Sequence, residues 1–250
     1  MTGSVPEHQL WFTALLNQYL AAPANAICNA VGFPIEDPAA TYSNGMAMQL
    51  LVALLLVIVL TSLRPRLSVD RPGKFQQVME IVWSFLKEQS HDVIGHGSDR
   101  YVPMFATLFL FILCGNLIGI IPTFEAPTMY IYVTAGCALV SFFFYNFHGV
   151  REQGVWGHIK HFMGPVWFIA PFMLLIEIIS HLIRPVSLSI RLYANMLAGE
   201  QVTVGFAALA PILVPVPTIL LHVFVSFVQA FIFTMLSMVY VGGVVAHEDH

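Results

Sequence analysis

The 250-residue chain is poor in charged residues and in cysteine, and both shortages restrict its class. Only 10% of the residues are charged, whereas roughly a quarter are charged in an ordinary soluble domain. Hydrophobic residues make up 58% of the chain, which is more than a soluble protein of this size could bury. The composition therefore excludes an ordinary soluble domain and predicts a polytopic membrane protein.

Motifs of common cofactor and metal chemistry are also missing. The three cysteines, Cys28, Cys114 and Cys137, fit no CxxC spacing and are expected to be small buried side chains. Without a P-loop, GxGxxG, HExxH or GxSxG motif, the chain gives no sign of nucleotide, dinucleotide or zinc-protease chemistry. No cofactor, metal ion or nucleic-acid partner is expected, and the HEDH of residues 247–250 is interpreted as a solvated tail.

The apolar segments predict an all-α protein with four or five membrane-spanning helices. In residues 72–94 apolar side chains recur at helical spacing, which predicts an amphipathic helix at the membrane interface. The expected division of the chain is an N-terminal outside segment at 1–45, a first span at 46–63, an inside loop with the amphipathic helix at 64–100, second and third spans at 101–147, an inside loop at 148–165 and a helical hairpin at 166–250.

The hairpin contains two unusually long apolar stretches, at about 166–207 and 217–246. Forty-two residues of helix would reach roughly 63 Å, whereas the hydrocarbon core of a bilayer is about 30 Å thick. The first stretch is therefore expected to be strongly tilted, broken, or partly parallel to the membrane. Pro171 and Pro185 are the candidate kink points.

Lysine and arginine set the expected orientation, because cytoplasmic loops carry an excess of both. Six of the ten lie in residues 64–100 and two in 148–165, and none lies in the N-terminal segment or the two other loops. With five spans, this distribution places the N-terminus outside and the C-terminus in the cytoplasm. The other two cations, Arg184 and Arg191, lie inside the apolar hairpin.

Polar residues form a stripe on the first helix of this hairpin. At 100° per residue, alternating spacings of four and three put six residues on one face: Glu177, His181, Arg184, Leu188, Arg191 and Asn195. Glu200 is expected on the opposite side, and on the last helix His222 and Gln229 share a face. Ionisable residues inside a membrane usually mark an ion path, a proton relay or a counter-ion.

Arg191 is the hardest of these residues to explain within the chain. Glu177 can pair with Arg184, a structural alternative that stays open, but Arg191 has no acid within a turn on its own helix. A guanidinium stays charged, so it cannot relay a proton, but it can lower the pKa of an approaching carboxylate by about 1–3 units. An arginine facing a moving carboxylic acid would thus separate two proton paths. The candidates for lining those paths are Glu177, Asn195, Glu200 and His222.

Two motifs of the hairpin together resemble a known family. RPVSLSIRLYANMLAGE at residues 184–200, followed by VQAFIFTMLSMVYVGG at 228–243, is similar to subunit a of the F-type ATP synthase, the stator half of its membrane proton channel. The similarity is strong over the last third of the chain. The rest agrees in layout, including FILCGNLIGIIP at 111–122.

The resemblance implies a proton-translocating stator subunit with two half-channels and no catalytic activity of its own. Its partners would be the c-subunit ring, the b subunits of the peripheral stalk, the rest of the complex and the membrane lipids, in a bacterial inner membrane. Arg191 would be the essential arginine that faces the c-ring. The other matching positions are Asn195, Glu200, Gln229, His222 and Glu177.

Three departures from the family pattern stand out. Arg184 replaces a common lysine, and YAN replaces the common FGN before Asn195. In PTMYIYV, residues 127–133, Tyr130 and Tyr132 occupy a stretch where many relatives have an Asp or Asn pair. Glu125 is the candidate that would substitute in the outer half-channel. The choice between H⁺ and Na⁺ is left to the rotor site.

Three other functions are weighed against this one. A self-contained ion-coupled secondary transporter would need its own midplane site and often has inverted repeats, and no internal repeat is evident. An intramembrane serine protease would need a base beside Ser180, Ser187 or Ser189, and no such pairing is readable. A purely structural scaffold would not need the polar stripe. Dependence of transport on a rotor ring would distinguish all three from the stator function.

Overall fold

The computed structural model describes residues 10–31, 41–69, 71–95, 97–121, 123–163, 170–209 and 215–245. Within these ranges the chain forms helices and no strand, which confirms the predicted all-α class. The elements are α1 (Trp11–Val31), α2 (Asn44–Leu63), η1 (Arg64–Arg66), α3 (Lys74–Ile94), η2 (Ser98–Arg100), α4 (Val102–Ile118), η3 (Pro127–Met129), α5 (Ile131–Met163), α6 (Ala170–Leu209) and α7 (Pro215–Val245).

Four helical segments are long and apolar enough to cross a membrane. They are Asn44–Leu63, Ile131–Glu152, Phe172–Phe206 and Val216–Val245. The apolar helix α4 has 17 residues, the lower limit for a span, and packs against α2, α3 and α7. The structure therefore agrees with the multi-pass membrane protein of four or five spans that the sequence predicts.

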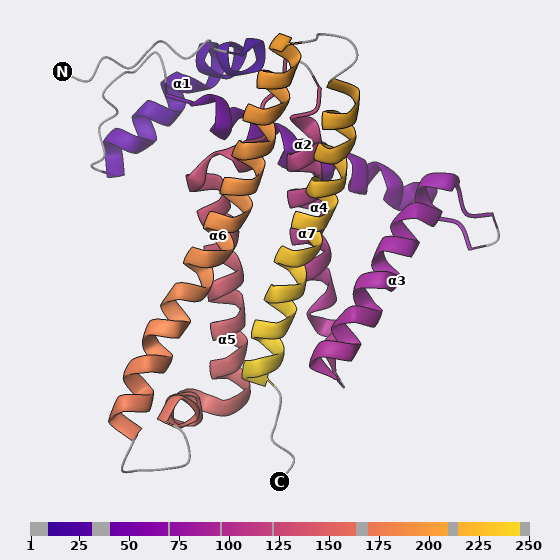
Figure 1. Ribbon diagram of the computed structural model, residues 1–250. Coiled ribbons are helices and arrows are strands. Elements are labelled where there is room, and N and C mark those ends of the chain that lie inside the picture. Colours follow the sequence, from indigo (N-terminus) through magenta and orange to yellow (C-terminus); the bar gives the residue numbers. More distant parts are fainter. Residues whose placement is uncertain are drawn as a thin grey trace.

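Helix α3 is the amphipathic helix expected at residues 72–94. Its buried residues are Leu86 and Ser90. The helix packs against α4 and α7, and it lies beside the bundle in Figure 1. Phe75, Val78 and Ile81 are exposed apolar residues on the same helix. They leave an apolar surface on α3 of the kind that an interfacial helix turns toward lipid.

Two features differ from the expected organisation. Residues 11–31 form helix α1 in a segment for which the sequence predicts no helix. The expected inside loop at 148–165 is helical up to Met163, because α5 continues past a break at Gly154. Gly154 has φ 72°, a left-handed value that glycine adopts without steric cost.

The hairpin of α6 and α7 crosses the whole bundle. Helix α6 has 40 residues and continues through Pro185 without interruption, so it is about 60 Å long and is not broken. The C-terminal end of α6 and the start of α7 lie at the same end of the molecule as α1 (Figure 1). The start of α6 and the end of α7 lie at the opposite end, near the end of α5.

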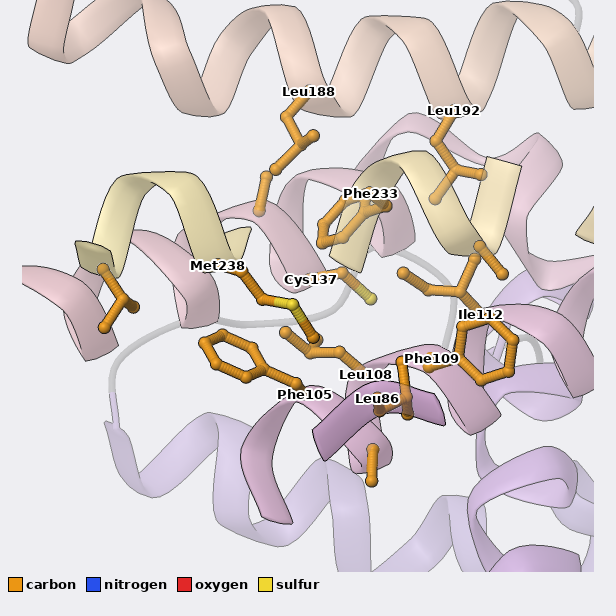
Figure 2. Packing of buried hydrophobic residues seen from close by; sticks show 14 of the residues in the cluster. Leu86, Phe105, Leu108, Phe109, Ile112, Cys137, Leu188, Leu192, Phe233 and Met238 are labelled. Atoms are coloured by element: carbon orange, nitrogen blue, oxygen red, sulfur yellow. The ribbon is translucent and has the colours of Figure 1, made fainter. Parts of the chain in front are cut away.

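The core lies where α4, α5, α6 and α7 meet. Figure 2 shows Leu188 and Leu192 of α6 pointing toward Phe233 of α7, Cys137 of α5 and the apolar side chains of α4. Each of these residues is at most 8% exposed. The packing fixes the rotation of α6 about its axis and thereby decides which of its polar residues face outward.

Candidate functional site

Arg191 is exposed on helix α6, away from the core. Its neighbours Leu188 and Leu192 are 2% and 1% exposed and face the bundle, whereas Ile190 is 52% exposed. Among the described residues, the structure shows no ion pair or hydrogen bond to the Arg191 side chain. The guanidinium is therefore held on an apolar outer surface where a group from another chain can reach it.

Arg184, two turns earlier on α6, is engaged within the chain. Its Nη2 donates to Oε1 of Glu177 at 3.0 Å, and its guanidinium lies 5.4 Å from the centre of the Tyr240 ring. The pairing of Glu177 with Arg184 that the sequence left open is thus present. The two arginines of one helix differ in this way: Arg184 has a carboxylate partner, and Arg191 has none among the described residues.

His181 connects the first half of α6 to α5 through polar contacts. Its side chain is 8% exposed, and Nε2 donates to Oδ1 of Asn146 at 2.8 Å. The Tyr145 hydroxyl lies 3.3 Å from the same nitrogen. Two turns further along α6, the hydroxyl of Ser189 lies 3.1 Å from that of Thr134 and forms a second polar contact between α6 and α5.

The predicted stripe of six residues is divided by these contacts. His181 and Leu188 are buried, Glu177 and Arg184 are half-buried, and Arg191 and Asn195 are exposed. Periodicity puts the six on one face, but α5 and α7 cover only parts of that face. The exposed part of the stripe is the pair Arg191 and Asn195.

Glu200 and His222 lie close to the contact of α6 with α7. His222 is 7% exposed, and its ring lies against Gly199: a Cβ added at that glycine would be 3.1 Å from Nδ1. Its Nε2 is buried and has no hydrogen-bond partner in the described part of the chain. Glu200, the next residue after Gly199, is half-buried. The carboxylate and the imidazole therefore lie at one level of the hairpin, nine residues beyond Arg191.

Glu125 lies in the loop before η3 and is connected to the same region. It accepts a hydrogen bond of 2.5 Å from the Tyr130 hydroxyl and is half-buried. The helix η3, which follows this loop, packs against α6, the helix that carries Glu200. Tyr132, by contrast, is exposed, and its hydroxyl lies 2.8 Å from that of Ser43.

Gln229 of α7 is buried, and so is His222. This agrees with the prediction that the two residues share one face of the last helix. On the same helix, the backbone oxygen of Ser226 accepts a hydrogen bond of 3.3 Å from Asn116 of α4, which in turn accepts one of 2.6 Å from Thr128. Asn116 is fully buried, so this network holds α7 against α4 and η3. The sequence places Asn116 within a family motif but gives no sign of its partners.

The arrangement can do two different things chemically. The exposed guanidinium of Arg191 can attract a carboxylate from outside and repel cations, and it stays protonated throughout. Glu125, Glu200 and His222 can each gain and lose a proton. Partners that the sequence did not indicate are contributed by other parts of the chain: Tyr130, Tyr145, Asn146 and Tyr240.

Comparison with known proteins gives consistent matches along the chain. A family model described as ATP synthase A chain matches residues 46–242. A protein of Koribacter versatilis named ATP synthase subunit a is 50% identical over 240 residues, which cover 96% of this chain and 98% of its own. A protein of the same name from Solibacter usitatus is 50% identical over 234 residues, with 94% and 100% covered. A third, from Geobacter sulfurreducens, is 43% identical over 194 residues, with 78% and 83% covered.

Proposed function

The chain belongs to the ATP synthase A chain family, and we propose that it conducts protons as the stator subunit of a rotary F-type ATP synthase. In this function the α6–α7 hairpin faces the ring of c subunits. Protons enter through one half-channel, load a rotor carboxylate, and leave through the other after almost a full turn. Arg191 separates the two half-channels and faces the rotor carboxylate as it passes.

The observation that carries the proposal is the exposure of Arg191 on an apolar surface. An arginine at the centre of a membrane-spanning helix costs roughly 2.5–3.5 kcal/mol on insertion scales. A helix retains such a residue when it pairs with a charge, and a moving carboxylate of the rotor would supply that charge. Because Arg184 already has Glu177, Arg191 is the cation of α6 that is available for the rotor.

Polar residues on either side of Arg191 support the two paths. Glu200 and His222, with Gln229 two turns along α7 from His222, would line one half-channel on the side of α1. Asn195 would lie beside Arg191 at the rotor surface, and Glu177 would lie along the other half-channel. Glu125 would extend the first path toward the outer face of the membrane.

The organisation of the complex follows from the same proposal. The chain would contact the c-ring and the b subunits of the peripheral stalk in a bacterial inner membrane. Its outside segment, spans, inside loops and hairpin would have the residue limits predicted from the sequence. Its N-terminus would lie outside and its C-terminus in the cytoplasm, as the lysine and arginine distribution predicts. ATP chemistry would belong to the soluble head, so this chain would be non-catalytic.

The experiment is to replace Arg191 by Ala in the whole complex and to use inverted membrane vesicles. We expect ATP-driven acidification of the vesicles to disappear, while assembly and the passive proton leak through the stripped membrane sector survive. The leak should survive because a missing separator does not close the half-channels.

Arg184→Ala is the matched control, since it removes the same charge from the same helix two turns away. Its pumping should stay well above that of Arg191→Ala, because Arg184 has its partner within the chain. Near-normal pumping by Arg191→Ala would show that Arg191 is a structural cation, and the proposed mechanism would then be wrong.

A further inference from the structure

Helix α1, which precedes the segment matched by the family model, has an exposed face without charge. Trp11, Leu15 and Tyr19 follow one another at spacings of four residues, which places them on one side of the helix. They are 59%, 46% and 70% exposed. Ala14, Gln18 and Ala22, which are also exposed, complete this face. A contiguous apolar surface of this kind marks a contact with a membrane or with another protein.

The other side of α1 is packed and hydrogen-bonded within the chain. Thr13, Leu16 and Ala21 are at most 7% exposed, and the helix packs against α2. The backbone N–H of Tyr42 donates to Oδ1 of Asn17 at 2.9 Å, and Nδ2 of Asn17 donates to the backbone oxygen of Tyr42 at 3.2 Å. These contacts fix the rotation of α1 about its axis, so its fold determines which side of the helix is exposed.

Further contacts place α1 at one end of the span α2. The backbone N–H of Leu10 donates to Oδ1 of Asn44, the first residue of α2, at 3.3 Å. Trp11 makes an edge contact with Phe124 in the loop after α4, with 6.3 Å between the ring centres. The other end of α2 leads into the cation-rich segment 64–100, which contains α3. Because α2 crosses the membrane, α1 lies at the surface opposite that segment, and Figure 1 shows α1 and α3 on opposite sides of the bundle.

We propose that α1 lies along this surface of the membrane and that Trp11, Leu15 and Tyr19 contact the lipid. Tryptophan and tyrosine are enriched where a membrane meets water, because each ring is apolar and carries one polar group. The two aromatic residues lie two turns apart on the exposed face, with the leucine between them. A helix face turned toward water typically carries charged residues, and α1 has none.

Lipid is the occupant that fits the surroundings of this face. The first turns of α2, to which α1 is bonded, expose Met46 and Leu50, which are 44% and 46% exposed on a helix that spans the membrane. The lipid around these residues therefore lies next to α1. Helix α3 leaves a similar apolar surface on the other side of the bundle, so the chain would have one interfacial helix at each membrane surface.

The test uses the whole complex in phospholipid vesicles and a spin label on a single cysteine at Tyr19→Cys. The three natural cysteines of the chain are replaced by alanine, and the other subunits are made free of cysteine. The accessibility of the label to oxygen, which concentrates in lipid, is compared with its accessibility to a water-soluble nickel chelate. Two controls define the scale: Leu54→Cys, 54% exposed on the span α2, and Val69→Cys, 98% exposed in the loop after η1.

The label at Tyr19→Cys should be several-fold less accessible to nickel than the label at Val69→Cys, and as accessible to oxygen as the label at Leu54→Cys. Nickel accessibility equal to that at Val69→Cys would show that the face is turned toward water, which overturns the proposed lipid contact. Low accessibility to both reagents would show that a protein covers the face, and it would overturn the lipid contact as well.

A second site on the same face keeps the test decisive if Tyr19→Cys does not assemble. Gln18 is exposed beside Tyr19, so a label at Gln18→Cys should give the same oxygen and nickel accessibilities, and a label there that nickel reaches as readily as at Val69→Cys has the same adverse meaning. The lipid contact of α1 does not depend on Arg191, so its failure leaves the proposed function standing, and normal pumping in Arg191→Ala leaves the lipid contact standing.

Discussion

Two adjacent glycines near the end of α7 give a sharp test of how α3 packs on the bundle. Gly242 is buried, and a Cβ added there would be 3.1 Å from the backbone oxygen of Val93 at the end of α3. Gly243 is exposed, and nothing lies within 4 Å of an added Cβ. Alanine at either position makes the same change in the same helix, so the two variants differ only in what the methyl group meets.

The expected magnitudes have opposite signs. Alanine is favoured over glycine inside a helix by about 1 kcal/mol, and about half of that remains this close to the end of α7. Gly243→Ala should therefore be slightly stabilising, by about 0.5 kcal/mol. At Gly242 the methyl group meets a backbone atom that cannot rotate away, and overpacking typically costs about 1–3 kcal/mol. Gly242→Ala should be destabilising, and the two variants should differ by about 2 kcal/mol.

The assay is heating of the purified complex in detergent, with the amount of this chain that remains in the complex recorded against temperature. A difference of about 2 kcal/mol corresponds to about 4–8 °C for a chain of this size. Gly242→Ala should lose the chain at the lower temperature. Equal midpoints for the two variants would mean that the end of α3 does not pack against Gly242, and the assignment of α3 to this position would be refuted.

Two further predictions concern α6. Leu192 is 1% exposed, so Leu192→Ala leaves a cavity in the core and should lower the stability of the chain by about 2–5 kcal/mol. Leu182 is 58% exposed, so Leu182→Ala should change the temperature at which the chain leaves the complex only a little. Equal temperatures for the two variants would contradict the packing in Figure 2. The ion pair of α6 can be tested with Glu177→Gln, Arg184→Gln and the double variant. The stability change of the double variant should differ from the sum of the two single changes by about 0–1 kcal/mol, because both side chains are partly exposed. A much larger difference would indicate that the pair is buried more deeply in the complex.

The membrane helices could be predicted from the sequence because their signal is local. A run of apolar residues long enough to cross the bilayer is itself the signature of a span, and the amphipathic helix α3 has a regular period. Helix α1 could not be predicted in the same way, because its composition is mixed and it contains Pro23. It is held by contacts from further along the chain, such as the backbone N–H of Tyr42 donating to Asn17 at 2.9 Å.

The candidate site could be predicted only in part, because burial depends on other helices. Spacing puts His181 and Arg191 on one face of α6, but the structure buries the first against α5 and exposes the second. The tyrosine that donates to Glu125 lies five residues away in a loop, where no periodicity applies. The packing of η3 against α6 also joins segments that are far apart in the sequence, and no local pattern encodes it.

The two arginines of α6 show why an incomplete set of contacts is itself informative. Each would be costly in lipid, and the chain compensates for one of them: Arg184 has a carboxylate at 3.0 Å and an aromatic ring at 5.4 Å. Arg191 has the same side chain on the same helix, and the core residues Leu188 and Leu192 hold it facing outward. An internal acid could have neutralised it as Glu177 neutralises Arg184. A guanidinium that was neutralised in this way could not attract and release a succession of rotor carboxylates, so the proposed function needs Arg191 to lack an internal partner.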